Sequence, residues 1–142
     1  MMSITLITNN EDLYHSVMSG EHIDGSSLDV LLRVRGLVHS GSRILTHPLC
    51  GNLRPNHQPY RSVIVDAVRG PADLDSLTMI EAAVSVYQSA EIITPGEIPE
   101  KTRADYAYID AEIMRDSLGH YGLIRDESLC DAPSLLLKEV LA

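Results

Sequence analysis

Apolar and polar residues alternate along the first ninety positions in a pattern typical of strands followed by helices. Short runs rich in Ile, Val and Leu, typical of buried strands, lie at residues 3–8, 43–46 and 62–68. Segments with apolar residues at helical spacing lie at residues 11–19, 27–40 and 73–88. Ser27 is the expected N-cap of the second helix, and Asp73 or Asp75 that of the third.

The order of these elements predicts the fold class. A helix between two buried strands acts as a crossover, and strands joined by a crossover run parallel. We therefore expect residues 3–8, 43–46 and 62–67 to be neighbouring strands of one mainly parallel sheet. The predicted architecture is α/β, a three-layer sandwich with a small sheet and helices on both faces.

The second part of the chain is predicted to be helical. Two prolines and a glycine in residues 90–101 indicate a loop, after which a capping pattern at Thr102 and Asp105 starts a helix that ends at Gly119. A short last helix is expected at residues 133–141. We predict a single domain over residues 1–142, with an α/β core at 1–89 and a helical extension at 90–142.

Composition excludes several classes of partner. The 142 residues hold 20 acidic and 11 basic side chains, and there is neither Phe nor Trp. Nucleic-acid binding is disfavoured, because it needs an extended basic face or aromatic stacking platforms. The first ten residues lack the basic region of a signal peptide, and no apolar run approaches the ~20 residues of a membrane helix. Cys50 and Cys130 form no paired motif, so we predict a cytoplasmic protein with reduced thiols and no membrane partner.

Charge is distributed unevenly along the chain. Residues 71–142 hold 14 acids and 5 bases, which accounts for the whole net charge of −9. No acid lies between Asp29 and Asp66, and this interval contains Arg33, Arg35, Arg43, Arg54 and Arg61. Arginine holds carboxylate or phosphate groups bidentately, so the interval suits an anion. The alternative is that these arginines pair with acids of the second half.

The segment at residues 46–62, THPLCGNLRPNHQPYRS, carries the strongest functional signal. Its three prolines stiffen a long loop between two strands, and long ordered loops are usually functional. Ligands of open α/β sheets bind where strands end, so this loop should meet the turn after the first strand. The predicted ligand-binding residues are Thr8, Asn9, Asn10, His47, Asn52, Asn56, Tyr60, Arg61 and Ser62. Because Asn10 opens a helix and Arg61 adds a fixed positive charge, we expect a small anionic ligand.

Each candidate residue also has a purely structural explanation. Asn9 and Asn10 are good helix caps without any ligand. Arg61 could be neutralised internally by an acid of the second half, such as Asp105 or Glu112.

Metal and cofactor chemistry is not predicted. His47, Cys50 and His57 could supply metal ligands, but their spacing is loose and no second cysteine or carboxylate lies nearby. The chain has no glycine-rich dinucleotide or P-loop motif, so we expect no nucleotide cofactor.

Three strings of this sequence resemble a known family. ITNN near the start, VRGLVHSG, and LTHPLCGNLRPNHQPYRS are similar to the GrdX family, in register over residues 3–85. The family consists of small proteins associated with gene clusters for glycine, sarcosine or betaine reductase. His57, Gln58 and Cys50 depart from its pattern, which weakens any role for His57 or Cys50. The resemblance implies a context and a class of partner, the reductase subunits, but no reaction.

Three functions remain open at this point. The one we favour is an accessory or assembly protein of a glycine-reductase-type system that binds a partner or a small anionic ligand through residues 46–62. The second is a small enzyme acting on an anionic metabolite, with His47 as acid or base. The third is a structural interaction module without a ligand. The aliphatic face formed by Leu77, Ile80 and Val84 fits either the core or the interface of a homo-oligomer.

Overall fold

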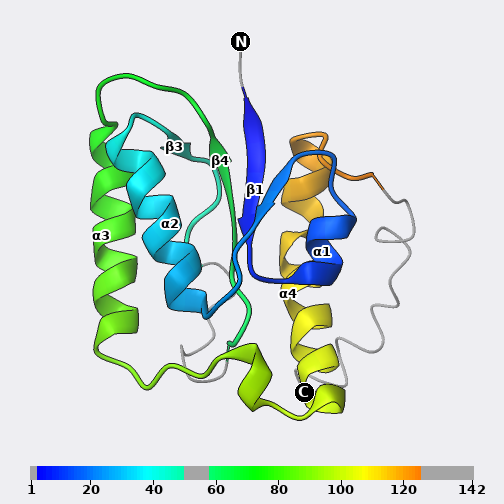
Figure 1. Cartoon of the computed structure of the whole chain (residues 1–142). Helices are drawn as coiled ribbons and strands as arrows, with labels where there is room; N and C mark the ends of the chain where they lie inside the picture. Colours follow the sequence, from blue (N-terminus) through cyan, green and yellow to red (C-terminus); the bar gives the residue numbers. More distant parts are fainter. Residues whose placement is uncertain (1–2, 50–57, 126–142) are drawn as a thin grey trace.

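A computed structural model describes residues 3–49 and 58–125 of the chain. Four strands form one sheet: β1 (Ile4–Thr8), β2 (Gly20–His22), β3 (Arg43–Ile44) and β4 (Ser62–Asp66). The helices are α1 (Glu11–His15), α2 (Ser27–His39), α3 (Leu74–Gln88) and α4 (Glu100–His120), with a short 3-10 helix at Pro95–Glu97. The strand order is β2-β1-β4-β3, so the fold is α/β as predicted (Figure 1).

The sheet is mixed, and the prediction of a mainly parallel sheet is wrong. Only β1 and β2 pair in parallel, while β4 is antiparallel to both β1 and β3. The three predicted strands are neighbours, and β1 and β3 run in the same direction on either side of β4. The physical reason is the connection between β3 and β4. It carries no helical pattern, so it reverses the chain instead of crossing over the sheet.

Helices cover both faces of the sheet (Figure 1). Successive side chains of the two central strands point to opposite faces, and both sets are apolar. Ile7 of β1 and Val63 and Val65 of β4 point into a cluster with α2 and α3. Leu6 and Ile64 point to the opposite face, where they pack against residues of α1 and α4 such as Leu13 and Met114. The two central strands are therefore buried on both sides.

Several element boundaries differ from those predicted. Ser26 and not Ser27 caps α2, through a capping box with Asp29. Asp73 caps α3 as expected, and α4 begins at Glu100, directly after Pro99 and before the predicted capping residue Thr102. The predicted helix at 133–141 lies outside the described residues.

The aliphatic face of α3 belongs to the core. Ile80 and Val84 are buried, and Leu77 packs against the same cluster of α2 and sheet residues. Among the described residues, no helix combines the length and the apolar composition needed to cross a membrane.

Candidate functional site

The end of β1 and the start of β4 meet at one edge of the sheet. Thr8 and Ser62 are paired across the two strands, and their hydroxyl oxygens are 2.7 Å apart. The sequence predicted this meeting from parallel strand ends, but antiparallel pairing produces it, because the last residue of β1 then faces the first residue of β4. The predicted neighbourhood of residues 8–10 and 60–62 is thus present for a different reason.

Asn9 ties three segments of this edge together. Its amide nitrogen donates to the carbonyls of Pro59 (2.8 Å) and Gly25 (3.0 Å), and its oxygen accepts from the backbone N–H of Arg61 (2.9 Å). The first contact fixes the end of the long loop, and the second fixes the segment after β2. All polar atoms of the Asn9 side chain are occupied within the protein.

Asn10 caps α1 and reaches α4. Its side-chain oxygen accepts from the Leu13 N–H, and its amide nitrogen donates to the carbonyl of Ala107 (3.0 Å) and to Oδ2 of Asp110 (3.1 Å). The Ser62 hydroxyl donates to the same carboxylate oxygen at 2.7 Å. Asp110 therefore joins α4 to the N-cap of α1 and to the first residue of β4 through a buried carboxylate.

The sequence analysis missed Asp110, although a signal was present. Asp110 lies at helical spacing with Ala107, Met114 and Leu118, all of which are buried, so an acid on that stripe is an anomaly. Burial raises the pKa of the Asp110 carboxyl, while the hydrogen bonds from Ser62 and Asn10 and the charge of Arg61 act in the opposite direction.

The Arg61 side chain is held inside the protein by hydrogen bonds to neighbouring side chains. Its side chain is 1% exposed and donates to the Gln58 side-chain oxygen (2.6 Å) and to the Tyr87 hydroxyl (2.7 Å). The guanidinium lies 5.6 Å from the centre of the Tyr87 ring, within range of a cation–π interaction. The guanidinium thus binds the Gln58 and Tyr87 side chains.

The acid of the second half on which the charge of Arg61 acts is Asp110, whose pKa it lowers, and not Asp105 or Glu112, the two named in the alternative explanation. Asp105 is exposed, and Glu112 pairs with Arg115. Two other arginines of the acid-free interval form exposed ion pairs, Arg33 with Glu21 and Arg35 with Glu81. These pairs remove Arg33 and Arg35 from the set available to an anion.

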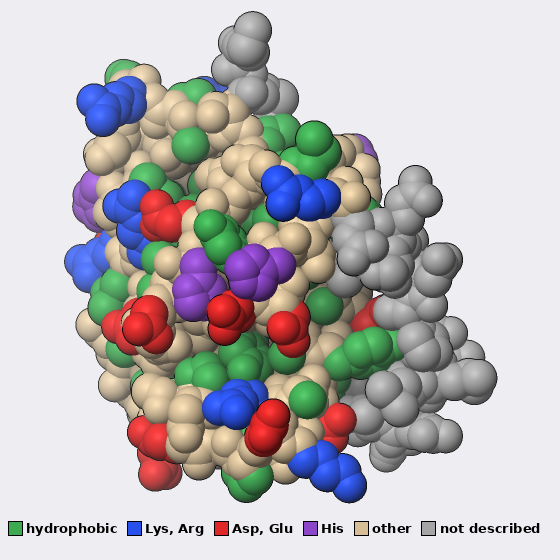
Figure 2. All heavy atoms as spheres, turned by 45° about the vertical axis from the view of Figure 1, so that its right-hand side comes forward, with side chains coloured by type: hydrophobic (Ala, Val, Ile, Leu, Met, Phe, Trp, Pro, Cys, Tyr) green, Lys and Arg blue, Asp and Glu red, His purple; other side chains and the backbone are tan. Residues whose placement is uncertain are grey.

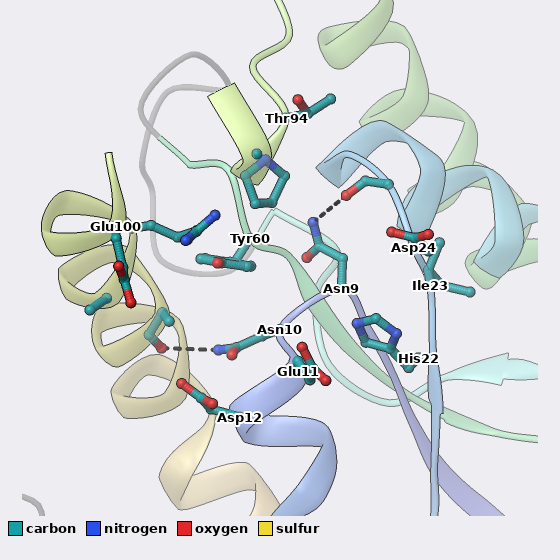
Figure 3. A pocket seen from close by; sticks show the side chains of 16 residues that line it. Asn9, Asn10, Glu11, Asp12, His22, Ile23, Asp24, Tyr60, Thr94 and Glu100 are labelled. Carbon is teal, nitrogen blue, oxygen red and sulfur yellow. Dashed lines mark hydrogen bonds between the residues drawn. The ribbon is translucent and has the colours of Figure 1, made fainter. Parts of the chain in front are cut away.

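A pocket of about 730 Å³ opens beside Asn9 and Asn10. Its walls are the start of α1, the segment at residues 22–25 after β2, Tyr60, the turn at residues 94–96 and the first turns of α4. Figure 3 shows Asn9 reaching the segment after β2 and Asn10 reaching α4, so these two hydrogen-bonding side chains hold opposite walls together. The pocket is therefore built on the same edge of the sheet that the sequence indicated.

Acidic side chains dominate the charge of this pocket. Its lining contains four carboxylates, those of Glu11, Asp12, Asp24 and Glu100, and one guanidinium, that of Arg103. The side of the molecule that carries α1 and α4 comes forward in Figure 2, where acidic side chains gather beside histidines. This charge differs from the positive site that Arg61 was expected to create.

Tyr60 is the most deeply buried titratable side chain of the lining. It is 8% exposed, and its hydroxyl has no hydrogen-bond partner among residues 3–49 and 58–125. Burial raises the pKa of the Tyr60 phenol, and the nearby charge of Arg103 opposes this shift. A hydroxyl that is accessible from a pocket and has no partner among the described residues is suited to a polar group of a ligand.

The predicted site residues divide into three groups. Asn9, Asn10 and Tyr60 line the pocket, whereas Thr8, Arg61 and Ser62 lie behind it and support it. His47 is exposed, accepts a hydrogen bond from the Leu49 N–H through Nδ1, and does not line the pocket. Asn52 and Asn56 lie outside the described residues, as do Cys50 and His57.

The remaining lining residues could not be found from local pattern. Asp24 lies far in the sequence from Glu100 and Arg103, and each of the three resembles an ordinary surface charge. In the part of the chain that the structure describes, no three His, Cys, Asp or Glu side chains stand close enough to share a metal ion.

Comparison with known proteins identifies a family. No curated protein and no solved structure matches the chain. A family model described as GrdX-like protein matches residues 5–119. This match extends beyond residues 3–85, and it includes every residue that lines the pocket, from Asn9 to Ala107. The chain therefore belongs to the GrdX-like protein family.

Proposed function

We propose that this chain is an accessory protein of a glycine-reductase-type system and that it binds a small metabolite in the pocket beside Asn9 and Asn10. Family membership and the three sequence strings support the reductase context. The pocket supports the ligand, because its volume of about 730 Å³ lies in the range of small-molecule sites.

The observation that carries the proposal is the Tyr60 hydroxyl. The residue is largely buried, but its hydroxyl is accessible from the pocket and has no partner among the described residues, while the neighbouring Asn9 and Asn10 side chains are fully engaged. A ligand group that bonds to this hydroxyl gives it a partner within the pocket. The hydrogen bonds that hold the walls in place also mean that little ordering is needed on binding.

A ligand with a carboxylate would meet Arg103 in this pocket. Arg61, the residue that the sequence favoured for an anion, donates to Gln58 and Tyr87 behind the wall. The proposed ligand site therefore lies at the predicted edge of the sheet, with Arg103 in place of Arg61 as the residue that contacts an acidic group.

The ligand is tested by thermal shift with free L-amino acids, small amines and small carboxylates, followed by calorimetry on those that raise the melting temperature. Tyr60→Phe should weaken binding of a hit about tenfold, the equivalent of one lost hydrogen bond of ~1.4 kcal/mol, without lowering the melting temperature of the free protein. Equal affinity in the variant and the parent would contradict the role of this pocket.

The accessory role is tested separately. Purified subunits of glycine, sarcosine and betaine reductase are mixed with the chain and analysed by size-exclusion chromatography, with and without the ligand. Co-elution with one of these subunits is expected. If no subunit binds under either condition, the accessory role is wrong, whatever the pocket binds.

A further inference from the structure

The charges of the pocket are separated between its walls. Glu11 and Asp12 lie at the start of α1, and Asp24 lies across the pocket from α4, which carries Glu100 (Figure 3). Arg103 follows Glu100 by one helical turn on α4, so the charges on that wall balance. The start of α1 and the segment after β2 contribute three carboxylates to the lining and no lysine or arginine.

Arg103 and Tyr60 form the basic end of the pocket. Arg103 makes no ion pair with any residue in 3–49 or 58–125, although Glu100 is on the same helix. The charge of Arg103 lowers the pKa of the Tyr60 phenol against the effect of burial, while the carboxylates of Asp12, Asp110 and Glu11 raise this pKa. A guanidinium next to a hydroxyl, both lacking a partner among the described residues, offers several donors to one carboxylate.

The two ends also differ in depth. Tyr60 is buried and Arg103 is half-buried, whereas Glu11, Asp12 and Asp24 are exposed. The basic end is therefore the inner end, and the acidic end lies at the mouth. Hydrogen bonds are stronger at the inner end, because solvent screens the exposed carboxylates.

We propose that the pocket binds an amino-acid-like zwitterion, with its carboxylate on Arg103 and Tyr60 and its ammonium group among Glu11, Asp12 and Asp24 at the mouth. This inference rests on the proposed function only in requiring that the pocket binds a ligand.

Ligands with a single charge fit less well. A simple anion would face four carboxylates of the lining, and a simple cation would leave Arg103 and Tyr60 without a partner. The carboxylates are also not grouped for a metal ion among the described residues, which favours the larger and more diffuse charge of an organic ammonium group.

The decisive experiment compares matched ligands by calorimetry on the full chain. The free L-amino acid that binds most tightly is compared with its decarboxylated amine and with the acid that lacks its amino group. The amino acid should bind at least tenfold more tightly than either. Equal affinity for the amine, or for the acid, overturns the zwitterion while leaving the proposed function in place.

A variant identifies the inner end. Arg103→Gln should reduce affinity for the amino acid at least tenfold and leave the weak affinity for the amine unchanged. Lys101→Gln, an exposed change on the same helix outside the pocket, is the matched control and should change neither. A uniform loss for all three ligands would overturn the assignment of Arg103, and binding of none of them would overturn both proposals.

Discussion

Asp110 should make the stability of this protein depend on pH in a direction opposite to that of most carboxylates. The carboxyl is buried, and burial raises its pKa above the ~3.9 of a free aspartate. Its contribution to folding is therefore fully present below about pH 4 and decreases as pH rises toward the elevated folded-state pKa. Each unit of pKa elevation corresponds to about 1.4 kcal/mol.

Two substitutions separate the charge of Asp110 from its hydrogen bonds. Asp110→Asn removes the charge but, with the amide oxygen in the place of Oδ2, still accepts from both Asn10 and Ser62, so the free energy of unfolding near pH 7 should stay within about 1 kcal/mol of the parent or rise. Asp110→Ala removes both hydrogen bonds and leaves a small cavity, and we expect a loss of about 2–4 kcal/mol.

The assay is urea unfolding followed by circular dichroism, from about pH 4 to about pH 8, a range chosen to start near the ordinary pKa of aspartate. The stability of the parent minus that of Asp110→Asn should fall with rising pH, and the effects of the other acids cancel in this difference. Asp116→Asn, an exposed acid on the same helix, is the control. A difference that is constant, or that increases with pH, would refute the reasoning.

Four further substitutions test other parts of the fold, by the same urea assay or, for Arg61, by thermal unfolding. Asn9→Ala removes three hydrogen bonds, two of them buried, and should lower the free energy of unfolding by about 2–4 kcal/mol; a loss below about 1 kcal/mol would contradict its linking role. Arg61→Met should lower the melting temperature equally with and without phosphate, whereas phosphate protection confined to the parent would restore Arg61 as an anion site. Gly36→Ala, in open space within α2, should stabilise by about 0.5–1 kcal/mol, while Gly41→Ala, at φ 113° against the backbone of Gly70, should destabilise by more than about 1 kcal/mol; equal effects would contradict the local geometry.

Local pattern located the strands but not their directions. The β-branched runs that became β1 and β4 were recognisable because both strands are buried on two faces. Strand direction depends on how the connection folds back, and periodicity carries no information about that.

Local pattern also placed the end of α1 too late. Leu13, Val17 and Met18 have helical spacing, yet α1 ends at His15. Val17 instead forms a β-bridge with Ile124, and the Met18 N–H bonds to the carbonyl of Leu123. A partner more than a hundred residues away therefore overrides the helical pattern, and no local window contains it.

Some residues of the candidate site could likewise be predicted from local sequence, and others could not. Asn9, Asn10 and Tyr60 could be predicted because each lies next to a strand end, a position that the sequence defines. Arg103 could not, because its place in the pocket depends on how α4 docks onto the sheet. In the sequence, only Asp110, an acid on the apolar stripe of α4, indicated that this helix packs against the sheet.

Asn10 and Asp110 are 100 residues apart in the sequence, and this distance affects how the chain folds while it is being synthesised. The face of the sheet under α2 and α3 is complete once residue 88 has been synthesised, because every member of its buried cluster lies before that point. The opposite face, with Leu6 and Ile64, is covered only in part, by Leu13 and Val17, until α4 follows with Met114 and Leu118. A chain emerging from the ribosome thus presents an apolar sheet face, with the polar side chains of Asn10 and Ser62 at its edge, for the time needed to add about thirty residues, roughly 2–6 s at ordinary elongation rates. Chaperone contact with the nascent chain should be concentrated in that interval.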